Sequence, residues 1–128
     1  MHIPKLLDLP GVELVEIANR TKASRDKVAA EFNISQVRSS WQEIISSDNV
    51  DAIVIGTGPY LHCEASCAGL KSSKHVLCEA SMAMNRAEAR QMFVASESSC
   101  HRIAQLVPAP FTLRADKTIR TYIKQGHR

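Results

Sequence analysis

The sequence has no long apolar run. None of its apolar stretches approaches the roughly 20 residues that a membrane-spanning helix needs. Residues 1–10 also lack the basic segment followed by an apolar segment that marks a secretory signal peptide. These absences argue against an integral membrane protein and a secreted one, and we expect a cytoplasmic protein. The 128 residues are enough for one domain with a core of its own.

A strong charge imbalance is also missing. Lysine and arginine number 16 against 13 acidic residues, and the net charge of +3 is too small to indicate a nucleic-acid partner. Four basic residues share one face of the helix expected at 113–124: Arg114, Lys117, Arg120 and Lys124. No aromatic platform accompanies them, so a solvated amphipathic helix explains them better than a nucleic-acid contact.

Cysteine is present without the pattern of a disulfide framework or a zinc site. The four cysteines are Cys63, Cys67, Cys78 and Cys100, and no two of them form a Cys-x-x-Cys pair. Histidines at 62, 75 and 101 could be recruited, but the spacing matches no common zinc site. We expect small, buried, reduced thiols and no metal.

Glycine is scarce, and a glycine-rich phosphate loop is absent. The five glycines stand at 11, 56, 58, 69 and 126, and none belongs to a Gly-x-Gly-x-x-Gly motif. Whatever this chain binds, it does not carry the usual cradle for a dinucleotide pyrophosphate.

What the sequence does contain is an alternation of apolar strands with helices. The expected strands are 12–18, a short one at 36–38, and 52–55, 76–78 and 103–107. Each of the intervening segments reads as a helix. Such alternation predicts an α/β protein with a parallel sheet, right-handed crossovers and helices on both faces.

The expected helices are indicated by N-cap residues and by apolar faces. Thr21 or Ser24, Ser40 and Asn85 are expected N-caps, the last two in capping boxes with Glu43 and Glu88. Residues 2–9 read as the last turns of a helix. The side chains expected to pack inward are Val28, Ala29, Phe32, Trp41, Ile44, Ile45, Leu61, Ala65, Ala68, Leu70, Ala89, Met92 and Phe93.

Three segments in order resemble one enzyme family. They are Leu9-Pro-Gly-Val-Glu-Leu-Val-Glu-Ile-Ala-Asn-Arg-Thr21, the stretch from Val50 to His62, and Val76-Leu-Cys-Glu-Ala-Ser-Met-Ala-Met-Asn85. Together they resemble the dinucleotide-binding half of the Gfo/Idh/MocA oxidoreductases. The resemblance implies an NAD(P)-binding Rossmann domain from a dehydrogenase of sugar or polyol-type substrates.

Asn19, Arg20 and Thr21 close the first expected strand. A sheet that selects NAD places an acidic side chain here to accept from the ribose 2′-hydroxyl. A guanidinium and a hydroxyl suit a 2′-phosphate instead. Taken alone, a solvated arginine and a helix cap explain these residues better. With the family resemblance they favour NADP, and NAD stays possible.

Gly56 to His62 follow the next long strand. Small residues let a cofactor approach the backbone, and the helix that follows favours an anion. The resemblance implies that Thr57, Gly58, Pro59 and His62 lie along the dinucleotide. The family usually has proline where Gly58 stands. Taken alone, this is an ordinary strand-to-helix turn, and His62 is an ordinary helix-surface residue.

Glu79-Ala80-Ser81 stands where the family carries Glu-Lys-Pro. The resemblance implies that Glu79 contacts the cofactor ribose and that the family's lysine assists proton transfer. Ala80 has no amine to donate or accept a proton, and Ser81 lacks proline's fixed torsion. No catalytic residue is therefore assigned.

The family's first strand and its glycine-rich loop have no counterpart in these residues. In a doubly wound sheet that strand is central, so its absence leaves the strands at 12–18 and 52–55 each with an unpaired edge. Buried unpaired amides and carbonyls cost about 1–3 kcal/mol each. We expect direct pairing of the two strands or self-association through their edges.

Residues 1–128 are thus interpreted as an incomplete Rossmann domain that binds NADP or NAD and is not catalytic by itself. The alternative is a non-enzymatic module, derived from that domain, that associates with itself or with a partner.

Overall fold

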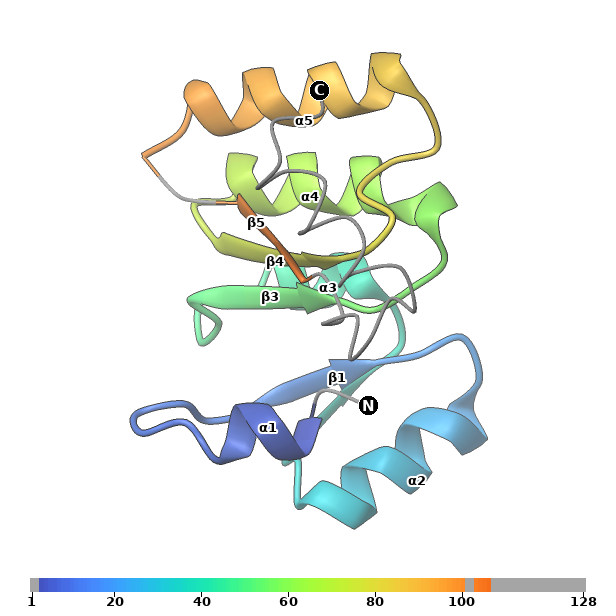
Figure 1. Cartoon of the computed structure of the whole chain (residues 1–128). Coiled ribbons are helices and arrows are strands. Elements are labelled where there is room, and N and C mark those ends of the chain that lie inside the picture. The colour runs from blue at the N-terminus through green and yellow to red at the C-terminus, as the bar shows by residue number, and fades with distance from the viewer. Residues whose placement is uncertain (1–2, 101–102, 107–128) are drawn as a thin grey trace, which may run out of the picture.

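Strands and helices alternate along the chain. The computed structural model describes residues 3–100 and 103–106 (Figure 1). Its strands are β1 (Glu16–Ala18), β2 (Gln36–Arg38), β3 (Ala52–Ile55), β4 (His75–Glu79) and β5 (Ile103–Leu106). Its helices are α1 (Ile3–Leu7), α2 (Lys22–Phe32), α3 (Trp41–Ile45), the 3-10 turn η1 (Pro59–Leu61), α4 (His62–Lys71) and α5 (Arg86–Glu97). The expected α/β class is confirmed. The helix expected at 113–124 lies outside the described residues.

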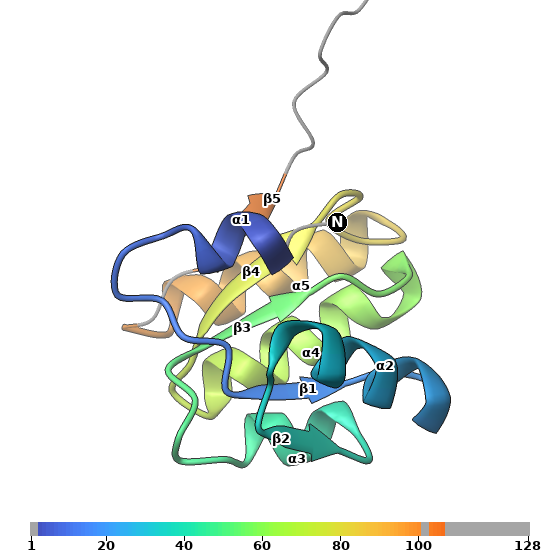
Figure 2. The ribbon, with the colours of Figure 1, turned by 90° about the horizontal axis from the view of Figure 1, so that it is seen from below.

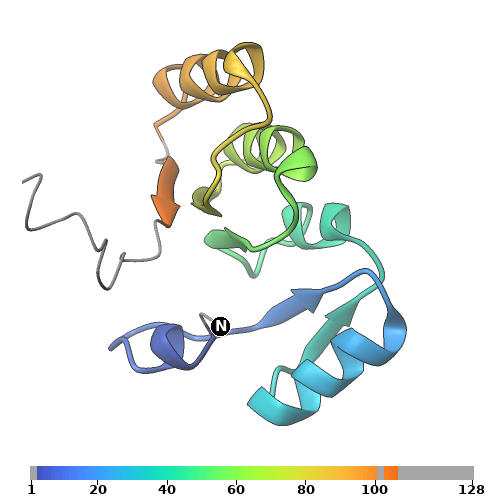
Figure 3. The same ribbon diagram turned by 45° about the vertical axis from the view of Figure 1, so that its right-hand side comes forward.

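The strands form two parallel sheets instead of one. β1 pairs with β2, and β3, β4 and β5 form a second sheet in that order. No hydrogen-bonded pairing joins β1 to β3 within the described residues, so the expectation that they pair directly is wrong there. Helix α3 contacts β1 and β2 of the first sheet and α4, which packs on the second, and so connects the two sheets (Figure 3).

The first strand is shorter than its apolar pattern indicates. Residues 12–15 are not strand, because β1 has a partner only over the three residues that β2 offers, in the register Glu16↔Gln36 to Ala18↔Arg38. One further hydrogen bond, from the Gln36 N–H to the Val15 carbonyl at 3.2 Å, ends the ladder.

A polar network ties the first sheet to the segments that precede β3 and β4. The Glu16 carboxylate, 1% exposed, accepts two hydrogen bonds of 2.9 Å from Arg38 and one of 2.6 Å from the Ser47 hydroxyl. The buried Lys74 Nζ donates to the carbonyls of Ser47 and Val50, both at 2.7 Å. Arg38 holds the pKa of Glu16 below its usual value, against the opposing effect of burial. Ser47 therefore links a carboxylate on β1 to an ammonium at the start of β4.

The core lies between α4 and the sheet of β3 and β4. Ile53, Val76 and Leu70 belong to it, and Gly69 lets the helix approach the strands closely, because a Cβ there would lie 2.5 Å from Ile53 Cδ1. Met92 of α5 is fully buried against this core.

Two expectations about buried side chains are wrong. Phe93 is 61% exposed, because a helix turns by about 100° per residue and α5 directs Met92 inward. Cys63, Cys67 and Cys78 are buried as expected, whereas Cys100 is exposed after the end of α5. No helix of the described part is long and apolar enough to cross a bilayer.

The expected caps are confirmed. Thr21, Ser40 and Asn85 accept hydrogen bonds from backbone N–H groups three residues on, at 3.2, 3.4 and 3.0 Å. In a capping box the glutamate accepts from the backbone N–H of the N-cap residue itself. Here Glu43 accepts from the N–H of Ser39 and Glu88 from that of Met84, each one residue before the N-cap.

Candidate dinucleotide-binding edge

The carboxyl ends of β1, β3 and β4 lie at one edge of the molecule. Figures 1 and 2 show β1 and β3 running in the same direction, and β4 is parallel to β3. Three connecting segments therefore meet there, namely residues 19–21, 56–62 and 79–81. Open α/β sheets bind ligands beyond this end of their strands, so the fold gathers all the candidate site residues at the expected edge.

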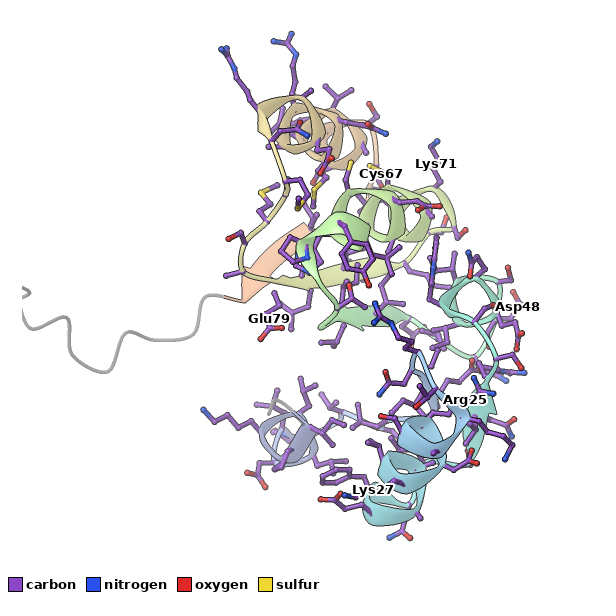
Figure 4. The ribbon with its side chains drawn as sticks, turned by 90° about the vertical axis from the view of Figure 1, so that its right-hand side faces the viewer. Arg25, Lys27, Asp48, Cys67, Lys71 and Glu79 are labelled. Atoms are coloured by element: carbon purple, nitrogen blue, oxygen red, sulfur yellow. The ribbon has the colours of Figure 1, made fainter. Side chains whose placement is uncertain are left out.

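Glu79 lies beside the first residue after β3. The register pairs Ile55 with Cys78, which brings Gly56 next to Glu79, and a Cβ added at Gly56 would lie 3.8 Å from the Glu79 carboxylate oxygen Oε2. Figure 4 shows the Glu79 side chain on the side of β4 that faces away from α4. The Glu79 carboxylate thus lies over the open backbone of Gly56, where a ribose could approach.

His62 joins two of the three segments from inside. Its ring is fully buried, with Nδ1 2.7 Å from the Ser81 carbonyl oxygen and Nε2 3.0 Å from the Thr57 carbonyl oxygen. Both ring nitrogens are thus engaged within the chain. The expectation of a helix-surface histidine is wrong, and the observed contacts give His62 the role of holding the loop after β3 against the loop after β4.

Position 80, directly after β4, carries no proton-transfer group. Ala80 and Ser81 are exposed, and the peptide bond between them is cis. An alanine side chain can neither accept nor donate a proton. The described site therefore offers Glu79 as its carboxylate and no amine at position 80.

Asn19, Arg20 and Thr21 are exposed and tied into a tight turn. The Asn19 side-chain oxygen accepts from the Arg20 N–H at 2.7 Å, and the Asn19 amide donates to Ser24 Oγ at 2.7 Å. Thr21 is occupied as the cap of α2, as the structural interpretation of this segment expects. Arg20 is exposed, and its guanidinium reaches across to the loop after β3, where it donates to Tyr60.

Thr57, Gly58 and Pro59 form the turn into η1. The Thr57 hydroxyl is exposed and donates to the Gly58 carbonyl at 3.3 Å, while Gly58 and Pro59 are half-buried. Pro59 occupies the first position of η1.

Tyr60 belongs to the same edge, although the sequence pattern did not single it out. Its hydroxyl accepts a hydrogen bond of 2.8 Å from Arg20 Nη2, across 40 positions of the chain. The signal that could have found it is an aromatic residue two positions after a glycine in a loop that follows a strand. Its partner could not be read from the sequence, because the contact exists only once both strands are in place.

The thiols near this edge are not poised for chemistry. Burial, with the neighbouring Cys67, raises the pKa of Cys63 to about 11, and burial also raises the pKa of Cys78. Both stay protonated near neutral pH and are poor nucleophiles and metal ligands. Within residues 3–100 and 103–106 no group of three or more His, Cys, Asp and Glu side chains could hold a metal ion.

A family model described as "Oxidoreductase family, NAD-binding Rossmann fold" (GFO_IDH_MocA) matches residues 1–105. This chain belongs to the Gfo/Idh/MocA family. The resemblance found in the three sequence segments is thereby confirmed.

Curated members of the family are similar over part of their length. A 1,5-anhydro-D-fructose reductase of Ensifer adhaerens is 33% identical over 89 residues, which are 70% of this chain and 27% of that protein. A scyllo-inositol 2-dehydrogenase (NADP(+)) of Bacillus subtilis (strain 168) is 30% identical over 72% of this chain and 28% of its own. A trans-1,2-dihydrobenzene-1,2-diol dehydrogenase of Mus musculus is 30% identical over 94% of this chain and 37% of its own. The match thus spans roughly a third of each relative.

Solved structures agree in fold. A mutant of KijD10, a 3-ketoreductase from Actinomadura kijaniata in complex with TDP-benzene and NADP, superposes with a TM-score of 0.79 at 22% identity, covering 97% of this chain and 39% of the other. A probable dehydrogenase from Thermotoga maritima gives a TM-score of 0.80 at 21% identity, covering 98% and 37%. At these sequence identities the superpositions show that the chains share the Rossmann fold and nothing more.

Proposed function

We propose that this chain supplies an incomplete dinucleotide-binding domain of a Gfo/Idh/MocA oxidoreductase acting on sugar or polyol-type substrates, that it prefers NADP, and that it is not catalytic by itself. The observation that carries the proposal is the edge where residues from three parallel strands meet, with the Glu79 carboxylate over Gly56 and the Arg20 guanidinium at the end of β1.

The residues at this edge suit the riboses and the 2′-phosphate of the dinucleotide, but not its pyrophosphate. Glu79 can accept hydrogen bonds from ribose hydroxyls, and Arg20 can donate to a 2′-phosphate. Asn19 and Thr21 shape the turn that carries Arg20, and Thr57, Gly58 and Pro59 line the open loop beside Glu79, with His62 beneath. No Gly-x-Gly-x-x-Gly segment is present to cradle the pyrophosphate, so we expect weak binding.

The cofactor, when bound, would exchange a hydride with the substrate carbon. Oxidation of an alcohol also releases the hydroxyl proton, which a base must accept. Ala80 supplies no base at the position where the family carries lysine, and this supports a binding role without turnover. The buried, protonated thiols are compatible with a reducing compartment, which supports the cytoplasm as the location.

Titration of the whole chain with NADP+ and NAD+ by isothermal calorimetry tests the proposal. We expect NADP+ to bind about tenfold more tightly than NAD+, because a charged hydrogen bond to the 2′-phosphate is worth about 1.5 kcal/mol or more. Glu79→Gln should weaken both by a similar factor. Absence of binding at millimolar concentrations of either dinucleotide would remove the cofactor role, and oxidation of a polyol with NADP+ by this chain would contradict the non-catalytic part.

A second candidate function is self-association or partner binding through the sheets. It is favoured by the pairing pattern, in which β1 and β3 each have a hydrogen-bonded partner strand on one side only within the described residues. Such edges are templates for a further strand.

A further inference from the structure

The contact between Arg20 and Tyr60 spans the two sheets at the candidate edge. Arg20 follows β1, Tyr60 lies in η1 after β3, and Arg20 Nη2 donates to the Tyr60 hydroxyl at 2.8 Å. Because β1 and β3 are not joined by backbone pairing, this side-chain hydrogen bond links their two carboxyl ends directly. The link lies at the surface, and Tyr60 is 61% exposed.

The backbone on each side directs the two side chains toward each other. Asn19 accepts from the Arg20 N–H and donates to Ser24, which fixes the turn that carries the guanidinium. On the other side, Gly58 has no side chain and so leaves room for the tyrosine ring. A Cβ at position 58 would lie 2.5 Å from Tyr60 Cε1 and 2.9 Å from Cδ1. A side chain at position 58 would therefore require the ring to shift from its observed place.

The pair has donors to spare for an anion. A guanidinium carries five N–H donors, of which one is used here, and no ion pair of Arg20 occurs among the described residues. The Tyr60 hydroxyl accepts one of these donors and leaves the others available. A phosphate placed beside the guanidinium would therefore receive hydrogen bonds from its remaining N–H groups, and the exposed tyrosine ring offers an apolar face for a neighbouring base.

We infer that Tyr60 is the positioning residue that makes Arg20 selective for an adenosine 2′-phosphate. Its hydroxyl holds the guanidinium at the end of β3 instead of leaving it free in solvent, so less side-chain freedom is lost when the phosphate binds. This inference rests on the proposed binding of a dinucleotide at this edge, and it names the residue pair that distinguishes NADP from NAD.

The test uses two small probes that differ only in the 2′-phosphate, 2′,5′-ADP and 5′-AMP, titrated into the whole chain and followed by NMR shifts. Tyr60→Phe removes one hydroxyl and keeps the ring. We expect it to weaken 2′,5′-ADP about 3- to 10-fold and to leave 5′-AMP within about twofold. Arg20→Gln should weaken 2′,5′-ADP at least as much. In the double variant Tyr60→Phe should have no further effect, because the hydroxyl acts through the guanidinium.

Arg90→Gln, on the exposed face of α5, controls for the loss of one positive charge and should leave both probes unchanged. If Arg20→Gln loses the preference for 2′,5′-ADP while Tyr60→Phe keeps it, Arg20 acts without Tyr60 and the inference is wrong although the proposed function stands. An equal loss for both probes in Tyr60→Phe would also overturn it. Failure of the wild type to bind the probes and NADP+ alike would remove the proposed function and the inference together.

Discussion

Single residues at the candidate edge have roles that their sequence neighbours do not reveal. His62 shows this most clearly, because it is completely buried and its two ring nitrogens face carbonyl oxygens of different loops. In a neutral imidazole one nitrogen donates and the other does not, so the tautomer decides which loop is held by a full hydrogen bond. His62 therefore joins the loop after β3 to the loop after β4.

Replacing His62 by leucine should remove the ring contacts to the Thr57 and Ser81 carbonyls, one of which is a donated hydrogen bond in a neutral imidazole. We expect the free energy of unfolding to fall by about 1–3 kcal/mol, since that hydrogen bond is lost at a fully buried side chain. Urea denaturation followed by circular dichroism measures it. Glu64→Gln, an exposed change in the same helix, should stay within about 0.5 kcal/mol of wild type, and equal stability of His62→Leu and wild type would contradict the assigned role.

At the scale of elements, the helices follow their sequence signals more closely than the strands do. Thr21, Ser40 and Asn85 each cap the helix they were expected to cap, because capping is a contact between neighbours in the chain. β1 is shorter than its apolar pattern, because a strand exists only where a second strand pairs with it. The Glu16 network was not predicted at all, since Arg38, Ser47 and Lys74 lie far from Glu16 in the sequence.

Glu16→Gln should destabilise the chain, by roughly 1–3 kcal/mol near pH 7, because one of the two acceptors of Arg38 becomes a donor and the other loses its charge. The pKa of Glu16 is lower in the folded than in the unfolded chain, so its contribution is complete above the unfolded value of about 4.3 and is lost as the pH falls through the folded value. The difference between wild type and variant should therefore be constant from neutral pH to about pH 5 and shrink below about pH 4.3.

Urea titrations at several pH values measure this difference. Glu13→Gln, an exposed substitution just before β1, serves as the matched control and should cause no comparable change at any pH. If the difference in unfolding free energy between wild type and Glu16→Gln grew as the pH fell, Glu16 would not be stabilised as a carboxylate.

The whole molecule is two parallel sheets held by helix α3, a polar network at one end and the Arg20–Tyr60 contact at the other. No backbone pairing joins β1 and β3 in the described part of the chain. Val54 on β3 is 42% exposed, so this edge strand also presents apolar surface. Both features favour addition of a strand from another molecule.

Sedimentation equilibrium combined with hydrogen exchange tests this association. We expect the average mass to rise with concentration, and amides of β1 and β3 to become slower to exchange as it does. Val54→Lys should shift the equilibrium toward monomer, because an edge lysine disfavours pairing. Val94→Lys on α5, where valine is 52% exposed, is the matched control. A monomer at all concentrations with freely exchanging β1 and β3 amides would end the second candidate function.

The sequence by itself determined the fold class, the caps, the bounds of β2 and β3, and the family, because these rest on local periodicity and on short segments in a fixed order. The tertiary structure decided that β1 and β3 stay apart, that Phe93 faces outward, that His62 is buried between two loops, and that Tyr60 meets Arg20. Each of these depends on contacts between residues far apart in the chain. Such contacts arise only when helix packing has set the distance between the sheets, and no local pattern contains that distance.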